Sequence, residues 1–405
     1  MEITPSEWEV HEDNPTLEAI HYSCLALSLV AIAVSVHLIF RHLRHFSQPI
    51  IQRKIIAILW MVPVYTTTAW LSLRFVRYSI YFDMVRDCYE SFVIYMFFAL
   101  CYCYIGQIDR DHIDRARIYT ALQAKGSVDH LFRFPACTGI PAQVDLNADP
   151  RLFLLTCKTY ILQFVVVKPL SAIAVIVLTL YFDNYEYGNF SFGNGYMYVT
   201  TIVNISITLS MYWLVMFYQA TSASLAPFRP VPKFLCIKGV LFFSYWQSVV
   251  ITILVKLGII TEIPVIHYSV EHVASTVQNA LICLEMVGFA FSHTFAFSAE
   301  SFYFLPTRLN TMETPLVASE QARVPVRTSA RAMLRNAVDF SDMVEDFQEV
   351  APELPIVRYL RRHSSATIQV QPSSGSLTDA PLVVPSAAGL EQMKKARTTP
   401  PAQNS

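Results

Sequence analysis

Apolar residues are concentrated in seven blocks within the first 300 residues, and polar stretches separate the blocks. An α-helix needs about 20 consecutive apolar residues to cross the hydrocarbon core of a bilayer, and the blocks have roughly this length. The third block is short, and we expect its helix to begin earlier, near Asp87. The pattern predicts seven transmembrane helices at Ile20–Phe40, Ile55–Phe75, Ser91–Ile105, Thr159–Tyr181, Tyr196–Gln219, Phe234–Ile260 and Thr276–Phe297.

The pattern divides the chain into four parts. Residues 1–19 form a tail outside the cytosol, and residues 20–300 form an all-α bundle of seven membrane helices. Residues 301–363 carry apolar positions at helical spacing, which predicts amphipathic helices on the inner leaflet; a transient helix in a disordered tail is the alternative. Residues 364–405 are rich in Ser, Pro, Gly, Thr and Gln, which predicts a disordered tail.

Composition agrees with an integral membrane protein. Of 405 residues, 54% are hydrophobic and only 15% are charged, and the mean hydropathy of +0.39 lies outside the range of soluble proteins. The eight cysteines include no CxxC pair and no zinc-ligand spacing. The sequence therefore predicts a membrane protein without a disulfide scaffold or a metal centre.

The positions of Lys and Arg predict the orientation, because cytoplasmic loops retain basic residues. Residues 1–40 contain no Lys or Arg, whereas the first, third and fifth connections and the tail are basic. The second connection is the exception, since Arg77 and Arg86 would lie outside, where Asp83 and Asp87 balance them. We therefore expect the N-terminus outside and the C-terminus in the cytosol.

Two modification candidates follow from this topology. Asn189 begins an Asn-Phe-Ser sequon in a predicted outer loop, so it is a glycosylation candidate. Cys101 and Cys103 lie at the cytosolic end of the third span, where cysteines are palmitoylation candidates; ordinary small residues at a helix end are the alternative. No basic segment precedes the first apolar block, so we expect it to be a signal anchor.

Two ionisable residues are expected near the middle of the bilayer. Lys168 lies roughly 13 Å of helix into the fourth span, and Glu285 lies roughly 15 Å into the seventh. An ionised group in hydrocarbon costs at least ~2.5 kcal/mol, so each needs a partner or a wet cavity. We expect the two side chains to face each other or a shared cavity, as part of a transport pathway or as a structural ion pair.

Polar residues at helical spacing mark further pathway candidates. Gln278, Glu285 and Ser292 share one stripe of the seventh span, and Asn204 and Thr208 share a stripe of the fifth with Thr200. Such stripes line pathways, and they also join helices by hydrogen bonds. Weaker candidates on the sixth span are Lys238 and Tyr245.

Charged residues also cluster at the predicted outer end of the third span. Arg86, Asp87 and Glu90 lie within one turn, and Arg86 and Glu90 are spaced to pair on one face. They form either an outer mouth that selects charged solutes or a solvated cluster at the membrane interface.

Several motifs in the same order resemble the organic solute transporter alpha / transmembrane protein 184 family. The resemblance covers about residues 20 to 300, and Asp339–Phe347 is similar to the family's tail helix. The motifs are Gln52-Arg53-Lys54-Ile55, Met61-Val62-Pro63-Val64-Tyr65, Trp70-Leu71-Ser72-Leu73, Tyr81-Phe82-Asp83, Arg86–Tyr95, Gln163–Leu170, Lys238 with Phe243–Gln247, and Cys283–Met286.

The resemblance implies a seven-span protein that moves steroid-like or other amphipathic organic anions by facilitated or ion-coupled transport. The family's transporter branch pairs with a single-span subunit, so that subunit or a second copy is a candidate partner beside the lipid bilayer. The alternative is a non-transporting scaffold that acts in trafficking or signalling. The expected location is the plasma membrane or an endomembrane such as endosome, vacuole or ER.

Other classes with similar topology lack their signatures here. The third span has no Asp-Arg-Tyr-type triplet and the seventh no Asn-Pro-x-x-Tyr pattern, so a heptahelical receptor is disfavoured. Residues 276–297 contain no lysine for a retinal Schiff base, and the His residues are too dispersed for a zinc hydrolase. We expect no enzyme activity, no cofactor, no metal and no nucleic acid partner.

Overall fold

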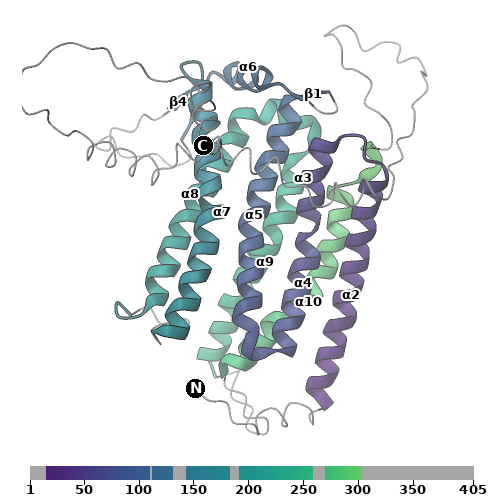
Figure 1. Ribbon diagram of the computed structural model, residues 1–405, viewed down its shortest axis with the longest axis vertical. Helices are drawn as coiled ribbons and strands as arrows, with labels where there is room; N and C mark the ends of the chain where they lie inside the picture. The colour runs from purple at the N-terminus through teal and green to yellow at the C-terminus, as the bar shows by residue number, and fades with distance from the viewer. Residues whose placement is uncertain (1–14, 110–111, 131–142, 183–190, 259–269, 303–405) are drawn as a thin grey trace, which may run out of the picture. The chain divides into compact units, whose positions relative to one another are not determined.

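The computed structural model describes residues 15–109, 112–130, 143–182, 191–258 and 270–302 (Figure 1). Eight helices, each longer than ten residues, make up one bundle. They are α2 (Pro15–Arg44), α3 (Pro49–Leu59), α4 (Met61–Arg74), α5 (Ser79–Gly106), α7 (Pro150–Tyr181), α8 (Gly195–Leu225), α9 (Pro230–Lys256) and α10 (Val270–Ala296). Two of them, α3 and α4, follow each other directly and together form one candidate membrane span.

Shorter elements join these helices. They are η1 (Val76–Tyr78), η3 (Ala226–Phe228), η5 (Ala299–Phe302), the 11-residue helix α6 (Arg115–Lys125) and the strands β1 (Gln107–Asp109), β2 (His112–Ile113), β3 (Ser127–Asp129) and β4 (Gln143–Asp145). The strands form two antiparallel pairs, β1 with β2 and β3 with β4. The expected all-α fold therefore has two small hairpins in its longest connection.

Six stretches of helix within the described residues are long and apolar enough to cross a membrane. They are Leu17–Arg44, Pro49–Arg74, Ser79–Gly106, Pro150–Thr179, Gly195–Phe228 and Val273–Ala296. The predicted sixth span corresponds to α9, a helix of 27 residues. The prediction of a helical membrane protein is confirmed, while the count of seven and the orientation stay predictions.

Two predicted spans differ from the helices that the structure shows. The second is divided into α3 and α4 at Trp60, three residues before Pro63. Proline has no N–H to donate to the carbonyl of Leu59, so this turn of helix is weakened there. The third begins at Ser79 and not at Ser91 or Asp87, because the charged first half of α5 is also helical.

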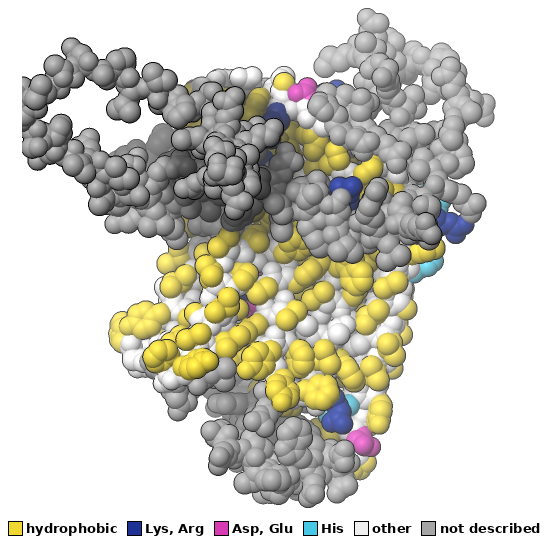
Figure 2. Space-filling view, viewed as in Figure 1, with side chains coloured by type: hydrophobic (Ala, Val, Ile, Leu, Met, Phe, Trp, Pro, Cys, Tyr) yellow, Lys and Arg dark blue, Asp and Glu magenta, His cyan; other side chains and the backbone are white. Residues whose placement is uncertain are grey.

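Helix α5 lies at the centre of the bundle, where it packs against α3, α4 and α7 and also touches α8 and α9. Its inner half is buried, and Phe98 meets Phe217 of α8 edge to face at 4.8 Å between ring centroids. Apolar side chains such as Ile173 of α7 and Ile202 of α8 are exposed on the outside. Figure 2 shows such side chains over the visible face, with charged side chains mainly near its ends. This distribution suits a bundle surrounded by lipid.

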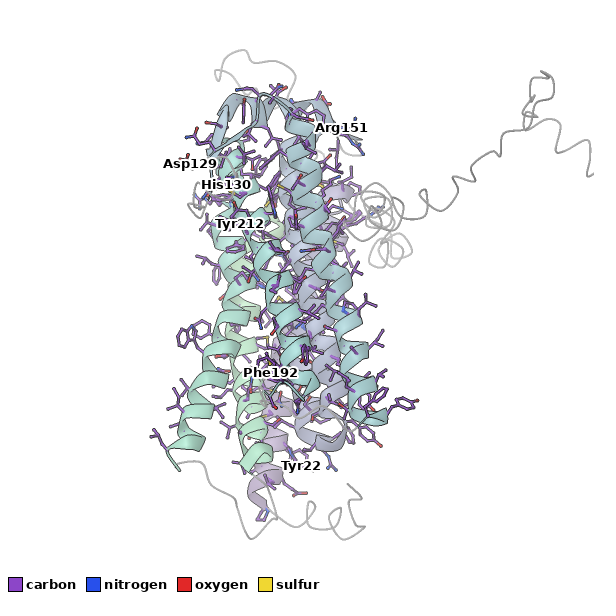
Figure 3. All side chains as sticks on the ribbon, turned by 90° about the vertical axis from the view of Figure 1, so that its left-hand side faces the viewer. Tyr22, Asp129, His130, Arg151, Phe192 and Tyr212 are labelled. Carbon is purple, nitrogen blue, oxygen red and sulfur yellow. The ribbon has the colours of Figure 1, made fainter. Side chains whose placement is uncertain are left out.

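The hairpins and α6 lie at one end of the bundle, where α2, α5, α8 and α10 end (Figure 1). We call this the α6 end. Asp114 caps α6 by accepting a hydrogen bond from the Ala116 N–H at 2.8 Å. Figure 3 shows Asp129, His130 and Arg151 at the α6 end and Tyr22 and Phe192 at the other. His130 contacts the Tyr212 hydroxyl of α8, which joins the β3–β4 hairpin to the bundle.

Gly106 ends α5 where β2 and α6 approach it closely. A Cβ atom at this position would lie 2.7 Å from Cγ2 of Ile113 and 2.8 Å from Cδ1 of the buried Ile118. We expect Gly106→Ala to lower the free energy of unfolding by about 1–2 kcal/mol, because overpacking displaces the neighbours. Thermal unfolding of the purified protein measures the change.

Gly288 of α10 provides the matched control. A Cβ atom there would meet nothing within 4 Å. Gly288→Ala should leave stability unchanged or raise it, because alanine favours helix over glycine. Equal melting temperatures for the two variants would contradict the close packing of α6 on α5.

The tail segments expected at 301–363 and 364–405 lie outside the described residues, which end at Phe302.

Candidate functional site

Helix α5 places Asp83, Arg86, Asp87 and Glu90 along the half of the helix that is remote from the α6 end. Positions separated by three, four and seven residues share one face of an α-helix. These residues and Lys168 of α7 are here called the charged cluster. All five are partly buried between helices.

Lys168 pairs with Asp87, because its Nζ lies 2.9 Å from Asp87 Oδ2. The Lys168 side chain is 14% exposed and the Asp87 side chain 48% exposed. The pair joins α7 to α5. A mid-bilayer lysine thus has a carboxylate partner, as the insertion cost requires.

Arg86 contacts two further groups, Asp83 and Asn279. Its Nη2 lies 2.8 Å from Asp83 Oδ1, and its Nη1 donates to the Asn279 Oδ1 of α10 at 3.4 Å. The Ser72 hydroxyl of α4 donates to the same Asp83 oxygen at 3.4 Å. Arg86 therefore pairs one turn back along α5, with Asp83 and not with Glu90. The expected Arg86–Glu90 pair is wrong because Asp83 lies closer to the guanidinium.

Among the members of the charged cluster that belong to α5, Glu90 lies nearest to the α6 end. It interacts electrostatically with Lys168 and with Lys238 of α9. The buried phenol of Tyr65 on α4 interacts electrostatically with Glu90, Arg86 and Asp87. Side chains from α4, α5, α7, α9 and α10 therefore meet at this cluster.

Glu285 contacts a different partner from the one expected. Gln247 of α9 donates from Nε2 to Glu285 Oε1. The remaining oxygens, Glu285 Oε2 and Gln247 Oε1, are buried without a hydrogen-bond partner among the described residues. The prediction that Lys168 and Glu285 pair directly is wrong, because Lys168 pairs with Asp87 and Glu285 with Gln247. The alternative, that the two side chains face a shared cavity, stays a prediction. Each ionisable group is nevertheless sheltered by protein.

The stripe expected on the fifth span lies on the outside of α8. Asn204 and Thr208 are exposed, and each side chain donates to a carbonyl four residues back in its own helix, Thr200 and Asn204 respectively. The polar residues that α8 buries are Ser206 and Ser210. Spacing identified the helical period correctly, but it could not identify which face turns inward.

The other expected site residues are dispersed. Gln278 and Ser292 are half-buried on α10, and the Ser292 hydroxyl donates to the Gly288 carbonyl at 2.9 Å. Tyr245 belongs to α9, but its side chain lies outside the described part of the structure, as does the whole of Asn189. Asp83, Ser72, Gln247 and Asn279 were not expected as site residues. For Ser72, Gln247 and Asn279 the signal is a polar side chain inside an apolar span, whereas Asp83 precedes the predicted third span and was expected only to balance basic residues of the second connection.

Cys101 and Cys103 are buried in the interior of the bundle. Their exposed fractions are 3% and 1%, and both belong to the half of α5 near the α6 end. Acylation of either thiol requires that it turn outward to the lipid. Their palmitoylation stays a prediction.

Comparison with known families agrees with this arrangement. The family model described as organic solute transporter Ostalpha matches residues 20–302. The chain belongs to this family. The matched segment includes the charged cluster and all helices from α3 to α10. No solved structure matches the chain.

Its family membership and its apolar helices together show that this Ostalpha-family protein is a multi-pass integral membrane protein with a solute-transporter-like role. The family is one of transporters and is not known for enzymes.

Proposed function

We propose that this protein moves amphipathic organic anions, of which steroid conjugates are the model solute, by facilitated or ion-coupled transport. The observation that carries the proposal is the charged cluster at the junction of five helices. Each buried ionic group costs free energy in the membrane, and replacing buried ion pairs by apolar residues is often stabilising. A fold that retains so many of them supports a role beyond stability.

Unused hydrogen-bonding capacity supports the same role. The partnerless oxygens of Glu285 and Gln247 lie between α9 and α10 and could accept a proton or a solute donor. Ion pairs that can exchange partners, such as Asp87 and Glu90 around Lys168, suit a site that alternates between two arrangements.

We further propose seven spans with the α6 end in the cytosol. The support is the distribution of basic residues, because Arg41, Arg44, Lys125, Arg151 and Arg229 all belong to elements at this end. Helix α9, with its length of 27 residues, supplies the seventh span. Glycosylation at Asn189, a plasma-membrane or endomembrane location and a single-span subunit or second copy as partner belong to the same proposal.

Reconstitution into liposomes tests the transport proposal. We expect purified protein to take up a radiolabelled steroid sulfate faster than protein-free liposomes do, with saturation and with inhibition by unlabelled sulfate. The variant Asp87→Asn/Lys168→Met removes both charges of this ion pair, so neither member is left as an unpaired charge, and Glu90 keeps Lys238 as a cationic neighbour. We expect it to fold and to lose at least about tenfold in uptake, which corresponds to ~1.4 kcal/mol.

The control is Lys125→Met on the exposed face of α6, which should transport as the unmodified protein does. Full uptake by the folded double variant would contradict a transport role for the pair. Absence of uptake by folded unmodified protein would favour the alternative, a scaffold in which the charged cluster serves only to hold the helices together.

A further inference from the structure

A cavity of about 640 Å³ opens at the α6 end, remote from the charged cluster. It lies where the end of α5, the turn η3, the start of α9 and the end of α10 meet. Its size is within the ~300–1,000 Å³ typical of small-molecule sites. Of the residues expected from the sequence to line a pathway, Ser292 is the one that lines this cavity within the described residues.

The cavity carries two cationic side chains. Lys233 Nζ donates to the Phe228 carbonyl at 2.6 Å and lies 5.8 Å from the centroid of the Tyr104 ring. Arg229 is exposed, and its backbone is held in the left-handed region with φ of 46°. Neither side chain forms an ion pair with any described residue, and Glu300 at the same end is paired with Arg41 at 3.7 Å. The cavity therefore has positive charge that is not neutralised by the described protein.

Much of the rest of the cavity wall is aromatic or otherwise apolar, and Gln48, Ser292 and Ser298 add polar groups to it. The rings of Tyr104 and Phe228 are stacked, with centroids 4.4 Å apart and planes tilted by 11°. Phe297 closes another side, with its centroid 6.0 Å from Lys233 Nζ. Phe295 stands at the rim and is 84% exposed on the outside of α10. A ligand here meets aromatic faces and lipid on one side and two cations on the other.

We propose that this cavity binds the anionic head and the adjacent apolar rings of an amphipathic anion, with Arg229 and Lys233 holding a sulfate or phosphate group. Guanidinium and ammonium groups form charge-assisted hydrogen bonds with such oxyanions. The aromatic side chains of Tyr104, Phe228 and Phe297 suit a rigid ring system better than a polar solute. Because Tyr104 and Phe228 stack on each other, a ligand meets their remaining surfaces. The inference rests on the proposed function and specifies where the solute's head would bind at the α6 end.

The same head chemistry is offered by a solute and by an anionic membrane lipid. Both carry a sulfate or phosphate monoester that is attached to an apolar body. A steroid sulfate and phosphatidic acid are therefore the two probes, and their behaviour in one experiment separates the two sources.

Binding of a radiolabelled steroid sulfate is measured on the full protein in phosphatidylcholine nanodiscs. We expect Arg229→Gln and Lys233→Gln each to weaken binding about tenfold, because each removes a hydrogen bond to a charged group. The matched controls Arg151→Gln and Lys125→Gln replace exposed cations at the same end and should change affinity less than twofold.

The neutral parent steroid, with a hydroxyl in place of the sulfate, separates head recognition from general loss of structure. It should bind the unmodified protein at least tenfold more weakly than the sulfate does. Both cavity variants should bind the two steroids almost equally, and Lys233→Arg should restore the preference for the sulfate. A variant that failed to fold would lose binding of both steroids.

Nanodiscs that contain phosphatidic acid complete the design. If the head site is occupied by a lipid, phosphatidic acid weakens sulfate binding to the unmodified protein and has no effect on Arg229→Gln. If it selects solutes, phosphatidic acid has no effect on either. Both results support the site and identify its occupant.

Equal affinity of unmodified protein and both cavity variants for the sulfate would overturn the inference, as would equal affinity of unmodified protein for sulfate and parent steroid. The proposed function fails separately: sulfate binding at the cavity without any uptake into liposomes would contradict transport and leave the site intact. Uptake that continues in cavity variants whose affinity for the sulfate is unchanged would contradict the cavity site and leave the transport proposal intact.

Discussion

Replacing Lys168 with methionine should lower the free energy of unfolding by about 2 kcal/mol. The substitution removes the partner 2.9 Å from Asp87 and leaves a carboxylate within the membrane bundle. An unpaired charge in a membrane helix costs ~2.5–3.5 kcal/mol, and the partial exposure of Asp87 reduces this cost. Thermal unfolding in nanodiscs, compared with Lys125→Met, measures the effect.

A second substitution tests whether the loss comes from the orphaned carboxylate. Asp87→Asn in the Lys168→Met background should recover most of the stability, because neither buried charge then lacks a partner. Recovery by less than a quarter of the loss would show that Lys168 stabilises the bundle by packing of its aliphatic stem. Asp87 would then not be its energetic partner.

Replacing Gln52 with leucine should lower the free energy of unfolding by about 3 kcal/mol, although Gln52 is a member of neither the charged cluster nor the cavity lining. Its fully buried amide accepts from the Gln48 N–H at 2.9 Å and donates to the carbonyls of His42 at 3.1 Å and His45 at 2.9 Å. Leucine has a similar size, but it leaves the Gln48 N–H and the His42 carbonyl without this partner, at about 1–3 kcal/mol for each group that water cannot reach. The His45 carbonyl keeps its hydrogen bond from the Ser47 N–H at 3.0 Å. Loss of melting temperature measures the cost.

The consequence should extend beyond the turn between α2 and α3. His42 is fully buried, and its Nε2 is 2.9 Å from the Phe297 carbonyl at the end of α10. Loosening His42 should therefore expose the end of α10 to faster hydrogen exchange. Gln123→Leu, on the exposed face of α6, is the control and should alter neither stability nor exchange. Stability of Gln52→Leu equal to that of the control would contradict the network.

The first motif of the family resemblance acquires a physical reason from this network. Gln52 begins the run Gln52–Ile55, in which two basic residues, Arg53 and Lys54, follow it. The sequence indicated that the motif was shared, but not what it did. The structure shows that Gln52 joins the end of α2 to the start of α3 by hydrogen bonds to backbone groups. Bonds to the backbone cannot be recognised from the pattern of side chains in the sequence.

The helices could be predicted because the bilayer imposes a simple rule on the chain. Every backbone polar group in hydrocarbon must be paired within the protein, so apolar blocks of sufficient length become helices whatever their neighbours are. The blocks at Ile20–Phe40, Thr159–Tyr181 and Tyr196–Gln219 each lie within an observed helix. The early start of α5 was missed because four charged residues made its outer half look like a loop.

The family, too, followed from the sequence, because its motifs recur in order along residues 20 to 300 and the family model matches nearly the same range. Pairing between side chains did not follow. Lys168 and Glu285 were expected together from their depths, but depth along a helix specifies height and not direction around the axis. The rotation of α5, α7 and α10 brings Asp87 to Lys168 and leaves Gln247 for Glu285.

The sequence by itself thus determined which segments form long apolar helices, which residues are charged within them and which family they belong to. Only the tertiary structure decided which charges meet and which polar stripe turns inward, as Asn204 and Ser206 of α8 show. It also decided that Tyr104, Arg229 and Lys233 surround one cavity. The physical reason is that hydropathy is a property of each segment alone, whereas contact depends on how each helix rotates against neighbours that are distant in the chain.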